Sequence, residues 1–175
     1  EGAISIYNAG KLVAVHKMPV ISIKKAGKTP KGNAKKKTVV DETAFRDLLL
    51  ENNVSLAVIE KAQAMRKGQL GRTQGVASSA TIMENYGLLR GICVGAGIRY
   101  IPVAPITWKT AMLKGVGMST SDKGASILRA EQLTSMSFGK DHNRAEAVLI
   151  GLYAVKEYGG MFGEAGDQRA TADAA

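Results

Sequence analysis

The sequence has little of what builds disulfide, zinc or membrane proteins. One cysteine among 175 residues excludes an internal disulfide framework and a cysteine-rich zinc site. Cys93 lies in an apolar run, which predicts a small core residue and fits a reducing cytosol. The longest apolar run, 88–96, contains Arg90 and is too short to cross a bilayer. We therefore expect a cytoplasmic protein with no membrane partner.

Aromatic residues and negative charge are also scarce. Aromatics make up 5% of the chain, which argues against an RNA-binding module that stacks bases on aromatic rings. Lys and Arg total 24 against 15 Asp and Glu, a net charge of +9. A basic surface favours a polyanionic partner, usually nucleic acid, although a merely soluble basic protein fits the charge equally well. The length and the 45% hydrophobic content predict one packed domain.

The first forty residues predict short strands and a loop. Two apolar runs flank Asn8-Ala9-Gly10, the pattern of a β-hairpin, and residues 20–23 could add a third strand. The lysine-rich segment 24–37 predicts a flexible loop. Its charge is as expected for a solvated loop, an interpretation that we favour slightly over a dedicated DNA clamp.

The rest of the chain alternates helices and strands. Strands are expected at 54–59 and 98–103, and helices at 79–96, 105–113 and 122–133, with two more that begin after Asp41 and near His142. Ser119, Thr120 or Ser121 could cap the helix at 122–133. Gly87, Gly91 and Gly95 form a smooth ridge along the helix at 79–96, which would permit close packing on a sheet, on another helix or on a second subunit. Residues 159–175, rich in Gly and Ala, predict a flexible tail.

Two acidic residues occupy unusual positions. Glu60 ends an apolar strand, and functional groups gather at the carboxyl ends of strands in sheets covered by helices. Glu146 shares a helix face with Leu149 and Tyr153, so it points toward the apolar interior or its rim. A carboxylate in such a place is costly unless it is paired or bound to metal. A neighbouring Lys or Arg would explain either acid as well as a metal would.

Five segments occur in the order found in one nuclease family. They are Gly2-Ala3-Ile4-Ser5-Ile6, Ile59-Glu60, Pro105-Ile106-Thr107-Trp108-Lys109, Ser121-Asp122-Lys123 and His142-Asn143-Arg144-Ala145-Glu146-Ala147. Together they resemble the phage branch of the RuvC-like Holliday junction resolvases. Each segment alone is a weak signal, but their order over residues 2 to 158 is specific.

The resemblance implies a ribonuclease H-like fold over residues 1–158, with a mixed five-stranded sheet and helices on both faces. It implies a homodimer that cuts four-way DNA junctions by phosphodiester hydrolysis with Mg²⁺ or Mn²⁺, in a bacterial cell or a phage-infected host. By position, Glu60 and Glu146 match metal-binding acids, and Lys109 and Lys123 match basic residues near the cleaved phosphate. The expected catalytic residues are Glu60, Glu146, His142 and Asp141; the metal ligands Glu60, Glu146 and Asp141; the DNA contacts Lys109, Lys123, Arg66, Lys67 and Arg72.

Two departures from the family pattern leave alternatives open. The family usually ends its last motif in Asp and places another Asp or a His three or four residues earlier. Here Asn143 and His142 hold those positions, Asp141 is five before Glu146, and His142 could simply cap the helix. The family's first metal-binding Asp would fall before Glu1. We therefore expect these 175 residues alone to bind junctions but to cut them poorly.

Two other functions compete with junction resolution. Another ribonuclease H-like nuclease would cut RNA–DNA hybrids or flaps with the same fold. A junction-binding protein without catalysis would also fit the incomplete set of acids.

Overall fold

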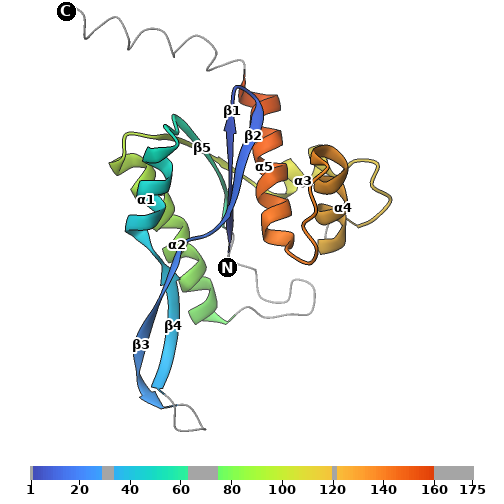
Figure 1. Cartoon of the computed structure of the whole chain (residues 1–175). Coiled ribbons are helices and arrows are strands. Elements are labelled where there is room, and N and C mark those ends of the chain that lie inside the picture. The colour runs from blue at the N-terminus through green and yellow to red at the C-terminus, as the bar shows by residue number, and fades with distance from the viewer. Residues whose placement is uncertain (1, 29–33, 63–74, 120–121, 160–175) are drawn as a thin grey trace, which may run out of the picture. The chain divides into compact units, whose positions relative to one another are not determined.

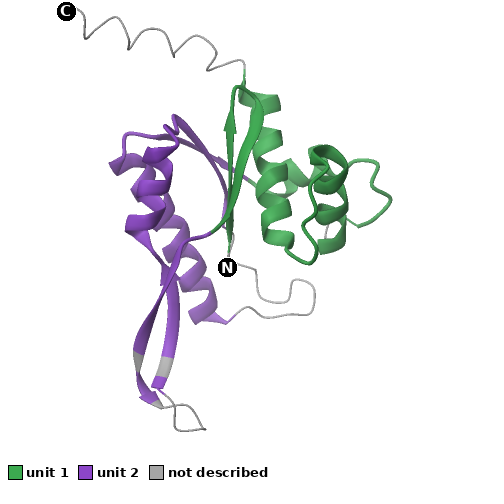
Figure 2. Cartoon of the chain, in the orientation of Figure 1, with its two compact units in different colours: residues 1–17, 104–175 green, residues 18–103 purple. Residues whose placement is uncertain are grey.

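The computed structural model of the chain describes residues 2–28, 34–62, 75–119 and 122–159. Its elements are shown in Figure 1. The chain divides into two compact units, and each is described by itself (Figure 2). Unit 1 comprises Glu1–Lys17 and Ala104–Ala175, and unit 2 comprises Met18–Val103. The prediction of a single nuclease domain over residues 1–158 stays a prediction.

Unit 1 begins with the predicted hairpin. Strand β1 (Ala3–Asn8) pairs antiparallel with β2 (Lys11–Lys17), with Ala3 opposite Lys17. The two turn residues both adopt a positive φ, 45° at Ala9 and 76° at Gly10. This is the conformation that a two-residue hairpin turn requires, and it explains the glycine at the second position.

Three helices complete unit 1. They are α3 (Pro105–Met112), α4 (Lys123–Thr134) and α5 (His142–Tyr158), and all three predictions are confirmed to within a residue. Helix α5 packs on β1 and β2 and also contacts α3 and α4, so it is the centre of the unit. The predicted apolar face supplies Ala145, Val148, Leu149 and Tyr153, which are all buried, and Gly151 lets the helix approach β1 closely. The fully buried side chains of the unit are Trp108, Ala125, Ser126, Ala130, Ala145, Val148 and Leu149.

Unit 2 begins with a second hairpin, where the sequence had predicted mostly loop. Strand β3 (Val20–Lys28) pairs antiparallel with β4 (Ala34–Val40). The third strand expected at 20–23 is confirmed and is longer than expected. The loop predicted over 24–37 is wrong where these strands extend into it. There Lys24 pairs with Lys36 and Lys28 with Ala34, so backbone pairing across the hairpin overrides the low strand propensity of lysine and glycine.

The remainder of unit 2 alternates helix and strand: α1 (Glu42–Glu51), β5 (Leu56–Glu60), α2 (Val76–Gly95) and β6 (Arg99–Val103). The Asp41 side chain caps α1 as expected, since its Oδ1 accepts a hydrogen bond from the Ala44 backbone N–H at 3.0 Å. Strands β5 and β6 run parallel. Cys93 on α2 is fully buried, which confirms it as a core residue, and burial raises the pKa of its thiol.

The protein is therefore a mixed α/β structure, as the sequence predicts. Within the described ranges the strands form three separate pairs, and a single five-stranded sheet is not resolved. None of the helices in those ranges combines the length and the apolar character needed to cross a membrane. A flexible tail was predicted for residues 159–175. All of them except Gly159 lie outside the described residues.

Candidate functional site

Two residues singled out by the sequence lie together in unit 1. The Nζ of Lys109, on α3, is 3.1 Å from Oε1 of Glu146, on α5. Ser126, on α4, donates a long hydrogen bond from its Oγ to the same carboxylate oxygen at 3.4 Å. The side chains of Lys109 and Glu146 are 24% and 20% exposed, so water screens this ion pair less than it would on an open surface. We call these three residues the Glu146 cluster.

The Lys109 ammonium lies over a buried aromatic ring. Pro105 occupies the first turn of α3, where its fixed φ suits a helix start and its missing N–H costs nothing. Trp108 is fully buried and anchors the helix. The Lys109 ammonium lies 5.2 Å from the centre of the Trp108 ring, within the range of a cation–π interaction. The lysine is thus positioned by both a carboxylate and an aromatic ring.

Helix α5 is fixed on β1 by two hydrogen bonds and a glycine. Ser5 Oγ donates to the Ala147 carbonyl at 2.7 Å, and the Tyr7 hydroxyl donates to the Val148 carbonyl at 2.9 Å. A Cβ at Gly151 would collide with the Tyr7 ring and with Ser5 Oγ, so only glycine permits this close approach. Burial raises the pKa of Tyr7, which keeps its hydroxyl a donor. These contacts set the position of Glu146 along the strand.

Asp141 caps the amino end of α5, a role that the sequence had suggested for His142. The Asp141 Oδ1 accepts a hydrogen bond from the Arg144 backbone N–H at 3.2 Å. Its Oδ2 lies 4.0 Å from the ammonium of Lys17, which is 80% exposed. His142 is the first residue of α5 and is half-buried. Capping and metal binding both use carboxylate oxygens, so the cap already occupies one of the oxygens that a metal would need.

The predicted metal ligands are Glu60, Glu146 and Asp141. Carboxylate oxygens suit Mg²⁺ and Mn²⁺, and Glu146 Oε2 has no hydrogen bond or ion pair within the described residues. The described part of the chain contains no group of three or more His, Cys, Asp or Glu side chains placed to hold a metal ion. The donor chemistry therefore fits such a cation, whereas a complete ligand set stays a prediction.

Glu60 belongs to unit 2 and ends β5, as the sequence predicts. Its partner in the parallel register is Val103, the last residue of β6. The next backbone N–H, of Lys61, donates to the Val103 carbonyl at 2.7 Å, so the strand pairing extends past the acid. Every residue of β5 is half-buried. Glu60 therefore sits at the carboxyl end of a parallel strand pair, the edge where α/β sheets place functional groups.

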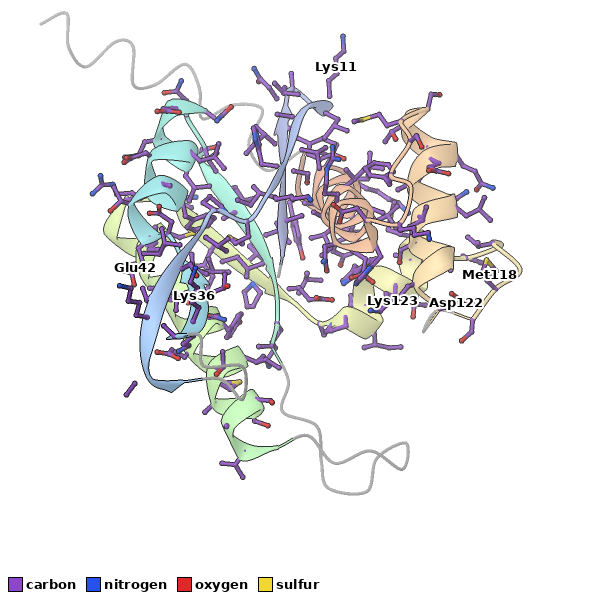
Figure 3. All side chains as sticks on the ribbon, turned by 60° about the horizontal axis from the view of Figure 1, so that its bottom comes forward. Lys11, Lys36, Glu42, Met118, Asp122 and Lys123 are labelled. Carbon is purple, nitrogen blue, oxygen red and sulfur yellow. The ribbon has the colours of Figure 1, made fainter. Side chains whose placement is uncertain are left out.

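The two lysines that the resemblance places near the cleaved phosphate lie at different ends of their helices. Lys109 lies in the last turn of α3. Lys123 is exposed and begins α4 (Figure 3), as expected. The cap of α4 is Asp122, whose Oδ1 accepts from the Gly124 N–H at 2.8 Å, so the proposed Ser and Thr caps were wrong. Asp122 thereby weakens the case for anion binding at this helix start, because it already supplies the negative charge. Arg66, Lys67 and Arg72 lie outside the described residues.

Ser126 is the member of the Glu146 cluster that the sequence interpretation missed. It is fully buried, like Ala125 and Ala130 on the same helix. The available signal was a stripe of small residues on this helix, since small side chains mark the face where a helix packs closely. A serine hydroxyl on that face needs a hydrogen-bond acceptor, and Glu146 provides one.

Comparison with known proteins finds similarity among solved structures. No protein-family model matches the sequence, and no curated protein matches it either. Among solved structures, the chain is similar to that of Thermus thermophilus RuvC, with a TM-score of 0.49 and 15% sequence identity, over 81% of this chain and 87% of that one.

Proposed function

We propose that this protein is a metal-dependent endonuclease that resolves four-way DNA junctions, in a ribonuclease H-like fold. The observation that carries the proposal is the Glu146 cluster, in which an acid and a lysine from two separate motifs of the resolvase resemblance meet at 3.1 Å. The resemblance implies that Glu146 binds metal and that Lys109 lies near the cleaved phosphate, but it names no contact between them. The net charge of +9 adds support, because a junction is a dense array of phosphates.

The chemistry of the cluster suits phosphodiester hydrolysis. The Lys109 ammonium can leave the Glu146 carboxylate and pair with a phosphate oxygen instead, since both partners are anionic oxygens. Ser126 and the Trp108 ring keep the two side chains in place during that exchange. A bound Mg²⁺ or Mn²⁺ would activate water and stabilise charge on the leaving oxygen. On the resemblance alone, Glu60 is proposed as a second metal-binding carboxylate, and Asp141 and His142 as candidates for a third ligand.

The contacts of Glu146 also favour a second candidate, a junction-binding protein without catalysis. A carboxylate neutralised by lysine is a poorer cation ligand than an unpaired one. The described residues also contain no cluster of three potential metal ligands. Binding of branched DNA needs only the positive surface, and no acid.

One experiment separates these functions. The purified protein is incubated in excess over labelled four-way junction, RNA–DNA hybrid, flap and linear duplex, each with Mg²⁺ or Mn²⁺ and with a chelator. Symmetric nicks in the junction alone, lost with the chelator, support resolution. Preferential cutting of hybrid or flap supports the other nuclease. Tight junction binding without any nick supports the non-catalytic protein.

The exposed side of α2 supports a homodimer. A Cβ added at Gly87, Gly91 or Gly95 would meet nothing within 4 Å, so the glycine ridge is not covered by the described residues of the same chain. Val76, Met83 and Val94 lie along the ridge and are 87%, 46% and 65% exposed. A row of glycines flanked by exposed apolar side chains lets two helices approach closely, and a second copy of α2 would cover both. A dimer would bring two cutting sites to the two symmetric strands of a junction.

A further inference from the structure

The β3–β4 hairpin has two faces that the pairing register distinguishes. Directly opposed residues share a face, and successive pairs along a strand alternate between faces. Three pairs share one face: Val20 with Val40, Ser22 with Thr38, and Lys24 with Lys36. We call Ser22, Lys24, Lys36 and Thr38 the lysine face. All four side chains are exposed.

The opposite face of the hairpin is turned toward the helices of unit 2. Ile23, Lys37 and Val39 line a cavity of about 260 Å³ together with residues of α1 and α2. Lys37 on this face lies 3.9 Å from a carboxylate oxygen of Glu84, on α2. This face therefore has apolar neighbours and a counter-charge within unit 2, whereas the lysine face is turned to solvent.

The lysine face carries uncompensated positive charge. Residues 18–40 contain seven lysines and no Asp or Glu. Lys24 and Lys36 are direct cross-strand partners, and neither forms an ion pair with any side chain in the ranges that the structure describes. Like charges placed opposite each other destabilise a strand pair. An anion lying across the pair would relieve this repulsion.

The same stretch lacks aromatic residues, which are common in the binding sites of two other anionic partners. Residues 18–40 contain no Phe, Tyr or Trp. Single-stranded nucleic acid binds on aromatic rings that stack on its bases, and segments that insert into a membrane interface commonly carry Trp or Phe on their apolar side. Lysines and hydroxyls on an extended ribbon instead match the donors that contact sugar–phosphate backbone. Figure 1 shows β3 and β4 running side by side away from α1, and Figure 3 labels Lys36.

We propose that the lysine face binds the phosphate backbone of duplex DNA, independently of base sequence, and holds one arm of the substrate. This inference takes the identity of the substrate from the proposed function, but it does not require that the protein cuts DNA. Lys24 and Lys36 supply the charge, and Ser22 and Thr38 supply hydroxyl donors beside them. The contact is made to the backbone, so it serves a linear duplex as well as a junction arm.

The test compares two double variants of the full chain. Lys24→Gln/Lys36→Gln removes the pair, and Lys11→Gln/Lys156→Gln removes two other exposed lysines, so both lower the net charge by two. Affinity for a linear duplex and for a four-way junction is measured by fluorescence anisotropy over a range of salt concentrations. Each lost phosphate contact lowers the slope of log affinity against log salt by about 0.9. We expect Lys24→Gln/Lys36→Gln to lower the slope by about two on both DNAs, and the control to lower it by less than one.

Other outcomes overturn the inference. An unchanged slope, an equal change in the control, or a wild-type protein that does not bind duplex would each do so. Binding of phosphatidylserine vesicles that depends on Lys24 and Lys36, with an unchanged DNA slope, would assign the face to a membrane instead. A melting temperature that falls in Lys24→Gln/Lys36→Gln would make the pair structural, because relief of repulsion predicts an equal or higher value. Cleavage is scored separately, so a protein that never cuts refutes the nuclease proposal while the slopes still decide this one.

Discussion

Lys109 and Glu146 are each other's partners, with 3.1 Å between Nζ and Oε1. The sequence had assigned one to a phosphate and the other to a metal ion. In unit 1 each neutralises the other, and Ser126 and the buried Trp108 ring hold the pair in place. The pair thus stabilises the DNA-free protein. When the two side chains separate, Lys109 offers a cation to a phosphate and Glu146 an anion to a metal ion.

A double-mutant cycle measures this coupling. Lys109→Met leaves a largely shielded carboxylate without its cation and should lower the free energy of unfolding by about 1–3 kcal/mol. Adding Glu146→Gln should recover part of that loss, with a coupling energy of about 1 kcal/mol. Urea denaturation of the two single variants and the double variant gives the value. Strictly additive effects would mean that the ion pair contributes nothing to stability. Lys140→Met, at an exposed position, is the control and should change stability little.

The two predicted phosphate-binding lysines should differ in their effect on DNA affinity. Lys123 is exposed, whereas Lys109 must first leave Glu146. Lys123→Ala should lower the slope of log affinity against log salt by about one unit. Lys109→Ala should lower it by less, because the ion pair holds part of its charge. Equal slopes for wild type and Lys123→Ala would place Lys123 on a solvated face away from DNA.

Gly151→Ala should loosen α5 from β1. The new methyl group would collide with the Tyr7 ring and Ser5 Oγ, and such overpacking costs about 1–3 kcal/mol. The shift would also strain the hydrogen bonds from Ser5 and Tyr7 to α5. Thermal unfolding tests the size of the effect. Gly159→Ala, in the same helix region where an added Cβ would meet only Val155 at 3.9 Å, is the matched control and should be nearly neutral.

Local chemistry allowed most helices and strands to be predicted. The Asp41 cap and the spacing of apolar residues in α1 and α5 are local signals, because each involves residues only a few positions apart. The structure confirms both helices. The β3–β4 hairpin was missed because its strands depend on pairing across the hairpin, and lysine has weak strand propensity. Periodicity assigns residues to faces but does not identify the neighbour on each face. The contact of Lys109 with Glu146 and the buried role of Ser126 therefore could not be predicted.

Gly91→Leu should block assembly and leave the protomer folded. Nothing in the described residues lies within 4 Å of a Cβ at this position, so unit 2 leaves space for a leucine, whereas a second helix packed on the ridge would not. Sedimentation velocity at micromolar concentration should show a wild-type dimer and a Gly91→Leu monomer with the same melting behaviour. Ser78→Leu, an exposed position on the other side of α2, controls for added apolar surface. A wild-type monomer would refute the dimer, and an unfolded Gly91→Leu would show that α2 packs within its own chain.

The central claim is that Glu60 and Glu146 are the carboxylates of a junction nuclease. The most direct test is single-turnover cleavage of a labelled four-way junction in Mn²⁺ by wild type, Glu60→Gln and Glu146→Gln, with junction affinity measured in chelator. We predict symmetric nicks by the wild type, and a rate at least about a hundredfold lower in each variant, on the scale of the charge stabilisation that a metal provides. Affinity should stay within about threefold, since neither acid supplies the phosphate contacts that dominate DNA binding. Cutting by either variant at the wild-type rate would contradict the account.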